Sequence, residues 1–211
     1  MIKLTDLVKK FGNKQVLDQF NLSIKVGEMI ALVGESGSGK STLLNILGLI
    51  EDFDSGEYLF FGEKNIKANT KKASKNIREK ISYLFQNFAL IETDTVEENL
   101  QVALKYKKVN KKEKQRLISS ALEKVGLKGY EKRRVHELSG GEQQRVAIAR
   151  VLIKPSEIIL ADEPTGSLDS KNRDEVLNLL KKMNREGKTI VIVTHDPEVS
   201  KVCSRVVELN A

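Results

Sequence analysis

Cysteine, tryptophan and proline are scarce in this chain. Its 211 residues include one Cys (Cys203), three Pro and no Trp. A single cysteine excludes an internal disulfide and a multi-cysteine zinc site, as is typical of a reducing compartment. No apolar run approaches the roughly 20 residues of a membrane span, and the opening MIKLTDLVKK lacks the apolar stretch of a signal peptide. The sequence therefore predicts a cytoplasmic protein that does not itself cross a membrane.

Charge is abundant, but by itself it does not identify a partner. The sequence has 36 Lys and Arg against 29 Asp and Glu, which gives a net charge of +7. Such a balance is compatible with nucleic acid, with anionic lipid or with solubility alone. The hydrophobic fraction of 40% is sufficient for a core. No internal repeat or long linker divides the sequence, so we expect a single domain over residues 1–211.

The first half of the chain predicts strands around one helix. Residues 1–33 contain three short strand-like runs, with an FGNK turn between the first two, and this pattern predicts an antiparallel start. A helix over 41–50, a hairpin over 54–64 and a strand over 81–85 are expected next.

The second half predicts helices followed by buried strands. Residues 87–152 are helical in pattern, and cap residues followed three positions later by Glu mark helix starts at Thr95, Asn110 and Ser139. Continuous apolar runs over 157–161 and 189–194 flank a helix over 170–187. This strand, helix, strand order predicts parallel strands that are buried on both faces, and hence an α/β fold.

A glycine-rich stretch, GESGSGKST, follows an apolar strand and precedes a helix. That context makes the pattern G-x-x-x-x-G-K-[ST] a phosphate-binding loop. Its glycines let backbone N–H groups converge on phosphate oxygens, Lys40 supplies charge to the β- and γ-phosphates, and Ser41 can coordinate Mg²⁺. The expected nucleotide-binding residues are therefore Gly34, Glu35, Ser36, Gly37, Ser38, Gly39, Lys40, Ser41 and Thr42.

Acidic and polar residues end the other predicted core strands. IILADEP places Asp162 and Glu163 at the C-terminal end of a strand, which is the edge where open α/β sheets bind ligands. Asp162 suits the water shell of Mg²⁺, and Glu163 suits a base that polarises attacking water, unless the two acids merely end the strand. His195 closes TIVIVTH and Gln86 closes ISYLFQ at the same edge. Four strand ends therefore converge on one predicted site.

Two adjacent glycines, Gly140 and Gly141, begin a strong helix pattern in VHELSGGEQQRVAIAR, where Ser139 and Glu142 form a capping box. Glycine destabilises such a helix by roughly 1 kcal/mol per residue relative to Ala. We therefore expect the absence of side chains at these two positions to serve a function. A helix N-terminus without Cβ atoms is an anion site. Because the chain's own phosphates are held elsewhere, we expect this site to meet the γ-phosphate bound by a second copy. The alternative is that the glycines only permit tight packing.

Four motifs occur in this order: GESGSGKST, LSGGEQQR, ILADEPTGSLD and THD. Together they resemble those of the ATP-binding subunit of an ABC transporter, over nearly the whole chain. The resemblance implies a P-loop ATPase core with a mostly parallel sheet, an antiparallel β subdomain and an inserted α-helical subdomain. The core and β subdomain are then residues 1–86 and 146–211, and the helical subdomain is about 87–145. ATP and Mg²⁺ are the implied ligands.

The resemblance also assigns roles by position. Residues 34–42 become Walker A, Ser139 to Glu142 the signature, 167–169 the D-loop and His195 the switch histidine. The implied catalytic residues are Lys40, Gln86, Glu163 and His195, and the implied metal contacts are Ser41, Gln86 and Asp162. Phe11, beside a hairpin turn, stands where the family often has Tyr; it either stacks on the purine ring or belongs to the core.

The partners implied by the resemblance are a second copy, in an ATP-dependent homodimer, and a separate membrane permease that holds the chain at the inner face of the cell membrane. A permease helix is expected to dock near Phe88, Leu90 and Ile91, unless these residues are subdomain core. DEPTGSLD and LFQNFALIETDTVEENL resemble exporters of macrolides, lipoproteins and bacteriocin-like peptides, and also the cell-division ATPase of that branch. ABC ATPases of DNA repair carry coiled-coil or zinc-bearing insertions, which this sequence lacks, so no nucleic-acid partner is expected.

Overall fold

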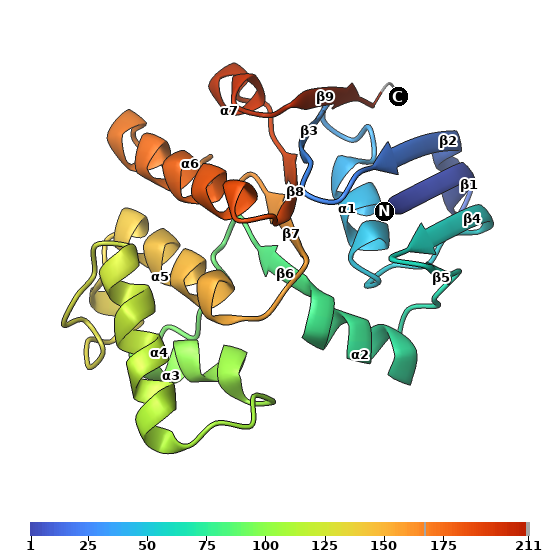
Figure 1. Cartoon of the computed structure of the whole chain (residues 1–211). Helices are drawn as coiled ribbons and strands as arrows, with labels where there is room; N and C mark the ends of the chain where they lie inside the picture. The colour runs from blue at the N-terminus through green and yellow to red at the C-terminus, as the bar shows by residue number, and fades with distance from the viewer. Residues whose placement is uncertain (167, 210–211) are drawn as a thin grey trace.

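Two sheets and two groups of helices make up the computed structural model, which describes residues 1–166 and 168–209 (Figure 1). The strands are β1 (Ile2–Phe11), β2 (Lys14–Ile24), β3 (Met29–Val33), β4 (Ser55–Phe60), β5 (Glu63–Lys64), β6 (Ile81–Leu84), β7 (Ile158–Asp162), β8 (Thr189–Val193) and β9 (Arg205–Glu208). The helices are α1 (Lys40–Leu47), α2 (Lys71–Lys80), α3 (Val96–Gln101), α4 (Lys111–Lys124), α5 (Gly140–Ile153), α6 (Ser170–Arg185) and α7 (Pro197–Lys201), with the 3-10 helices η1 (Val102–Leu104) and η2 (Val135–Glu137).

The central sheet is parallel, in the order β6-β7-β8-β3-β9, and both of its faces are covered. Along β7, Ile159 and Ala161 join the apolar cluster of α5 and α6, whereas Ile158 and Leu160 join the cluster of α1 and the antiparallel sheet. Successive strand residues face opposite sides, so a strand between two layers must be apolar throughout. Figure 1 shows α1 on one side of this sheet and α5 and α6 on the other.

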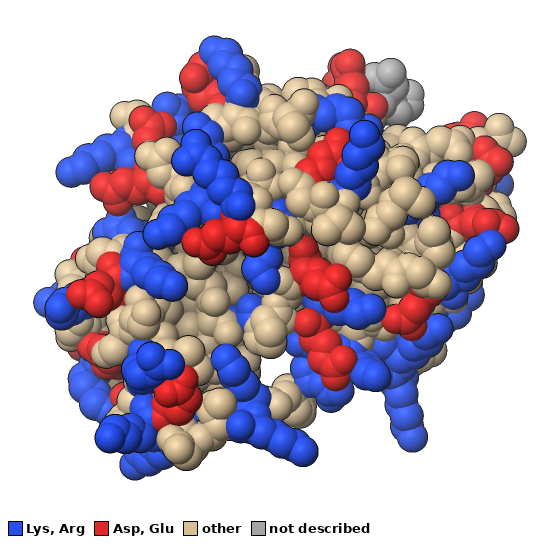
Figure 2. Space-filling model, viewed as in Figure 1, with Lys and Arg blue, Asp and Glu red and all other residues tan. Residues whose placement is uncertain are grey.

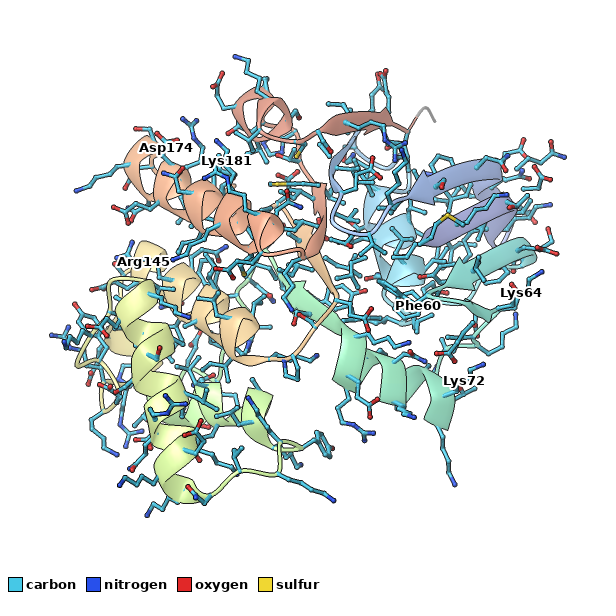
Figure 3. All side chains as sticks on the ribbon, in the orientation of Figure 1. Phe60, Lys64, Lys72, Arg145, Asp174 and Lys181 are labelled. Carbon is cyan, nitrogen blue, oxygen red and sulfur yellow. The ribbon has the colours of Figure 1, made fainter. Side chains whose placement is uncertain are left out.

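The antiparallel sheet has the order β2-β1-β4-β5 and covers α1. Its inward residues are fully buried, as Phe60 on β4 is (Figure 3). The predicted antiparallel start is correct for β1 and β2, but it is wrong for the third run. That run is β3, which pairs in parallel with β8 and β9. The continuous apolar sequence MIALV explains the difference, because only a strand covered on both faces buries every side chain.

The helical segment follows the sequence pattern closely. Thr95, Asn110 and Ser139 cap α3, α4 and α5, and each side chain accepts a hydrogen bond from the backbone N–H three residues later. The helices enclose their own apolar residues, including Leu100, Leu122 and Val146, which continue into the cluster against α6. None of the described helices is long and apolar enough to cross a lipid bilayer.

Candidate functional site

A cavity of about 600 Å³ opens at the C-terminal edge of the parallel sheet. Strands β6, β7, β8 and β3 are neighbours and run in one direction, so the segments that follow them meet there. The predicted site residues that line the cavity are Phe11, Gly34, Ser36, Gly37, Gly39, Lys40, Ser41, Thr42, Gln86, Asp162, Glu163 and His195. The convergence of four strand ends, expected from the sequence, is therefore present in the structure.

The phosphate-binding loop is held in shape by its own backbone and by Lys40. The Lys40 ammonium donates to the carbonyl oxygens of Gly34 (2.8 Å) and Glu35 (2.6 Å), and it lies 3.5 Å from the hydroxyl of the buried Ser38. Gly39 caps α1 with a φ of +93°, and a Cβ there would lie 2.6 Å from a methyl group of Val16. Only glycine fits this close approach, which leads the loop into the N-terminus of α1.

Asp162 and Ser41 line the cavity with oxygen atoms of the kind that magnesium prefers. Burial raises the pKa of Asp162, while a hydrogen bond from Ser41 and the charge of Lys40 oppose that rise. Gln86 lines the same cavity, and its amide oxygen is a further hard ligand. The described residues contain no cluster of three His, Cys, Asp or Glu that could hold a metal ion alone. One carboxylate and a hydroxyl fit Mg²⁺, because this ion takes its remaining ligands from water and substrate phosphates.

Glu163 and His195 contact each other at the rim of the cavity. The Glu163 Oε1 atom lies 2.8 Å from His195 Nδ1, and since a carboxylate can only accept, the imidazole Nδ1–H is the donor. The Glu163 side chain is 16% exposed, whereas that of His195 is 76% exposed. The Glu163 backbone has a φ of +44°, which costs a residue with a side chain about 1 kcal/mol or more. The fold thus fixes this carboxylate through a strained turn and through His195.

Phe11 lies at the mouth of the cavity with its side chain half exposed, and the Lys9 ammonium is 4.6 Å from its ring centroid. Lys14 and Val16 also line the cavity, although the sequence analysis did not identify them. Lys14 is the cross-strand partner of Phe11. The two-residue turn between them, Gly12 and Asn13, is the signal that would have placed Lys14 beside the aromatic ring.

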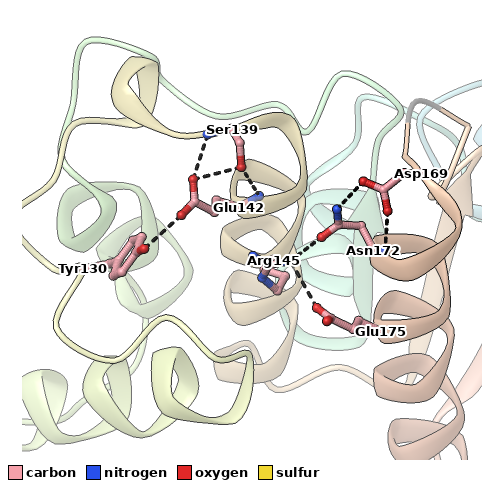
Figure 4. A network of polar contacts seen from close by, with 7 residues as sticks. All are labelled: Tyr130, Ser139, Glu142, Arg145, Asp169, Asn172 and Glu175. Carbon is pink, nitrogen blue, oxygen red and sulfur yellow. Dashed lines mark hydrogen bonds and ion pairs between the residues drawn. The ribbon is translucent and has the colours of Figure 1, made fainter.

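The signature residues lie apart from this cavity. Ser139 and Gly140 are exposed at the N-terminus of α5, and the described lining of the cavity includes none of residues 139–142. The capping box is complete, because the Glu142 carboxylate accepts from the Ser139 N–H (2.8 Å) and hydroxyl (2.9 Å), and the Ser139 hydroxyl accepts from the Glu142 N–H (3.3 Å). The Tyr130 hydroxyl donates to the other Glu142 oxygen at 2.9 Å (Figure 4). The signature is therefore a rigid, outward-facing helix end.

The two signature glycines have different reasons to be glycine. A Cβ on Gly141 would lie 2.7 Å from Oδ1 and 2.8 Å from Cγ of Asn172, whereas a Cβ on Gly140 would meet nothing within 4 Å. Asn172 is held by Asp169 (2.7 Å) and by Arg145 (2.7 Å), so it has little room to move (Figure 4). The chain itself therefore already requires a bare Cα at Gly141, as the packing alternative expects, and the approach of a partner's nucleotide to this helix end stays a prediction. Ser167, the first residue of the predicted D-loop, lies outside the described residues.

A second cavity, of about 940 Å³, lies between α2 and the segment that contains η1. We call it the α2–η1 groove; its lining includes Ser82, Val102, Tyr106, Arg150 and Lys154. Val102 and Tyr106 expose 55% and 65% of their surface.

Phe88, Leu90 and Ile91 are not among the described lining residues of this groove, although Ala89 is. Phe88 and Leu90 are partly buried and pack against the apolar cluster of the helical segment, which favours the core alternative for these two residues; their docking role stays a prediction. Ile91 remains half exposed.

A parallel sheet whose strand ends surround a phosphate-binding loop defines a P-loop nucleotide-binding protein. The family model described as "ABC transporter" matches residues 17–166, and the chain belongs to this family as an ATP-binding domain.

Similar proteins agree with this assignment. The chain is 42% identical over 210 residues to a macrolide export ATP-binding/permease protein, MacB, of Campylobacter jejuni; the match covers 100% of this chain but 33% of that protein. It is 42% identical over 211 residues to an uncharacterized ABC transporter ATP-binding protein, YvrO, of Bacillus subtilis, over 98% of this chain and 92% of that one. The chain thus spans about a third of the length of the macrolide export relative.

Among solved structures, the chain resembles the ATP-binding cassette MJ0796, described as dimeric, in a post-hydrolysis state and bound to ADP and Pi. The TM-score is 0.90 and the sequence identity is 39%, over 100% of this chain and 94% of that one.

Proposed function

We propose that this chain is the ATP-hydrolysing subunit of an exporter and that it drives a separate membrane permease. The observation that carries the proposal is the meeting of the loop 34–42 with Gln86, Asp162, Glu163 and His195 in one cavity. In the proposed division, residues 1–86 and 146–211 form the core with its β subdomain, and about 87–145 form the helical subdomain.

Each polar group at the cavity has a task in this proposal. ATP with Mg²⁺ supplies the phosphoanhydride bond that is broken. Lys40 exchanges its loop carbonyls for phosphate oxygens, and Ser41 and Asp162, with Gln86, hold the ion. Glu163 orients water and accepts its proton, and His195 keeps that carboxylate in place. Phe11 offers its exposed ring to the purine.

The exposed position of the signature residues favours a homodimer as the form that hydrolyses ATP. Ser139 and Gly140 face away from their own cavity, so the N-terminus of α5 can reach a γ-phosphate only in a second copy. A two-fold axis would complete two sites at once. The dimeric state described for the ATP-binding cassette MJ0796, at 39% identity, supports this arrangement. The helix dipole and bare N–H groups would then stabilise charge on the transferred phosphoryl group.

The test of the reaction is Glu163→Gln. We expect turnover to fall by roughly 10²–10⁴ while ATP affinity stays nearly constant, because only the transfer of a proton from water is affected. The same variant should show an ATP-dependent dimer in size-exclusion chromatography with light scattering, since it binds ATP without consuming it. Lys40→Ala is the control, because it should weaken nucleotide binding itself. Equal hydrolysis by the wild type and Glu163→Gln would remove Glu163 from the mechanism.

We propose that the α2–η1 groove receives the permease, at the inner face of the cell membrane. The support is its exposed apolar lining at Val102 and Tyr106, since exposed apolar patches of this kind mark interaction sites. The names of the macrolide export relatives combine an ATP-binding part with a permease, and this chain matches one third of such a protein. Val102→Ser with Tyr106→Ala should retain basal ATP hydrolysis but lose co-purification with the permease. Unchanged assembly would exclude the groove as the docking site.

A further inference from the structure

The α2–η1 groove has a cationic lining as well as an apolar one. Its basic residues are Arg78, Lys107, Lys108, Arg150 and Lys154, and its one acidic residue, Glu79, already pairs with Arg78 at 3.1 Å. Figure 2 shows Lys and Arg on both sides of a notch at the lower edge of this face, with Asp and Glu among them; Figure 1 places the helical segment and α2 on the two sides of the notch. An occupant of this groove must therefore match apolar surface and positive charge together.

Lys154 is a partly buried cation in the lining of this groove. Its ammonium donates to the carbonyl oxygens of Ile77 (2.9 Å) and Ile81 (2.5 Å), which uses two of its three protons. Burial, together with the nearby charge of Arg150, lowers the pKa of Lys154 to about 8. No carboxylate of the described residues lies within ion-pair distance of it. Lys154 is thus a partly buried charge whose hydrogen bonds, among the described residues, go only to neutral carbonyl oxygens.

Arg150 and Ser82 add donors to the same groove. Arg150 donates to the carbonyls of Ala89 (2.5 Å) and Phe88 (2.8 Å), so its charge is also met only by neutral acceptors. Ser82 is 1% exposed, and its hydroxyl has no hydrogen-bond partner among the described atoms. A buried hydroxyl without a partner is costly and requires an explanation. An ammonium, a guanidinium and a free hydroxyl in one groove form a donor set suited to a carboxylate.

We propose that the permease segment that fills the α2–η1 groove carries an Asp or Glu whose carboxylate binds Lys154, with Arg150 and Ser82 beside it. This inference rests on the proposed docking of the permease in the groove. The carboxylate would offset the repulsion between the two cations and accept from Ser82. The apolar lining would hold the rest of the segment, while Lys107 and Lys108 at the rim would attract an acidic partner over a longer range. A segment with a basic face would be rejected.

The test uses the full chain and its permease, purified as a complex and reconstituted in nanodiscs. Lys154→Met keeps the long apolar stem and removes the charge, Lys154→Arg restores the charge, and Lys112→Met on the exposed side of α4 is the matched control. We expect the affinity for the permease to fall about 10- to 100-fold in Lys154→Met, which corresponds to the loss of one charged hydrogen bond. The affinity should recover in Lys154→Arg and stay unchanged in the control. Basal hydrolysis and thermal stability are measured on every variant.

The partner's residue is found by changing each cytoplasmic Asp and Glu of the permease to the corresponding amide. One of these changes should weaken binding as much as Lys154→Met does. That permease change combined with Lys154→Met should weaken binding no more than either change alone. Ser82→Ala, which leaves both cations in place, should weaken binding by a smaller factor. Suppose that folded Lys154→Met binds the permease with normal affinity while Val102→Ser with Tyr106→Ala still disrupts the complex. This result would refute the proposed carboxylate contact and leave the docking proposal in place. If neither Lys154→Met nor the double variant Val102→Ser with Tyr106→Ala weakened permease binding, both the carboxylate and the docking proposal would be overturned.

Discussion

The contact between Gly141 and Asn172 predicts that two adjacent glycines respond differently to the same substitution. Gly140→Ala and Gly141→Ala both replace glycine by alanine in the first turn of α5, so both gain up to about 1 kcal/mol in helix propensity. Only Gly141→Ala places a methyl group 2.7 Å from Asn172 Oδ1. Asn172 cannot yield without straining its bonds to Asp169 and Arg145. The difference between the two variants therefore isolates the cost of the clash.

That cost is the cost of overpacking, about 1–3 kcal/mol. For a chain of this size, such a difference lowers the melting temperature of Gly141→Ala by about 3–9 °C relative to Gly140→Ala. The measurement is thermal unfolding of the isolated chain without nucleotide, so that dimerisation does not contribute. Asn172→Ala removes the three atoms that a Cβ would meet, and in the Gly141→Ala background it should restore most of the loss. Equal melting temperatures for the two glycine variants would refute the packing argument.

The same contrast decides which glycine tests the dimer. Gly141→Asp would stop dimerisation either by charge or by displacing Asn172, so it cannot separate the two causes. Gly140→Asp adds negative charge at an open position, and it should preserve stability and monomeric ATP binding while abolishing the ATP-driven dimer. Normal dimerisation of Gly140→Asp would show that no phosphate approaches this end of α5.

Three further predictions follow from individual contacts. Hydrogen bonds from Ser139, chiefly from its backbone N–H, lower the pKa of Glu142 below 4.5, so the stabilisation is full above that pH and disappears as the pH falls through the lowered value. Urea unfolding should show Glu142→Gln to be about 1 kcal/mol less stable than wild type at pH 7, with a difference that shrinks as the pH falls below 4.5. Phe88→Ser should destabilise the helical segment, seen as a lower urea midpoint, instead of uncoupling transport. Phe11→Ala should weaken ATP binding in calorimetry by about 10-fold while Phe11→Tyr retains it, because stacking needs only the ring.

The ends of the core strands could be predicted because their signal is local. Continuous apolar runs that end in Gly34, Gln86, Asp162 or His195 indicate buried parallel strands, and such strands place their ends at one edge. The order of strands in the sheet is not local. The chain order of β7 and β8 therefore did not reveal that Glu163 and His195 would touch, although the sheet makes those strands neighbours.

Contacts between helices also could not be predicted from the sequence pattern, because they too join residues that are far apart in the chain. A Cβ on Gly141 would meet Asn172 only because α5 packs against α6, and the sequence pattern gave no sign of this neighbour. The sequence also did not predict which surface of the protein faces its proposed partners. Phe88 and Val102 are both apolar residues after Gln86, and only the packing of the helical segment shows that the first packs against the core whereas the second is exposed.

Helix α5 connects the two surfaces on which the proposed function depends. Its N-terminus carries the signature, Ser139 and Gly140, and its last turn carries Arg150, which lines the α2–η1 groove. Arg150 also donates to the carbonyls of Phe88 and Ala89, in the loop that follows Gln86. The 14 residues of α5 span about 21 Å, and a helix whose buried face includes Val146 to Ala149 moves as one body. In the proposed complex, a displacement of the groove end of α5 would therefore shift the signature end and the Gln86 loop together, and this would couple the permease to ATP hydrolysis.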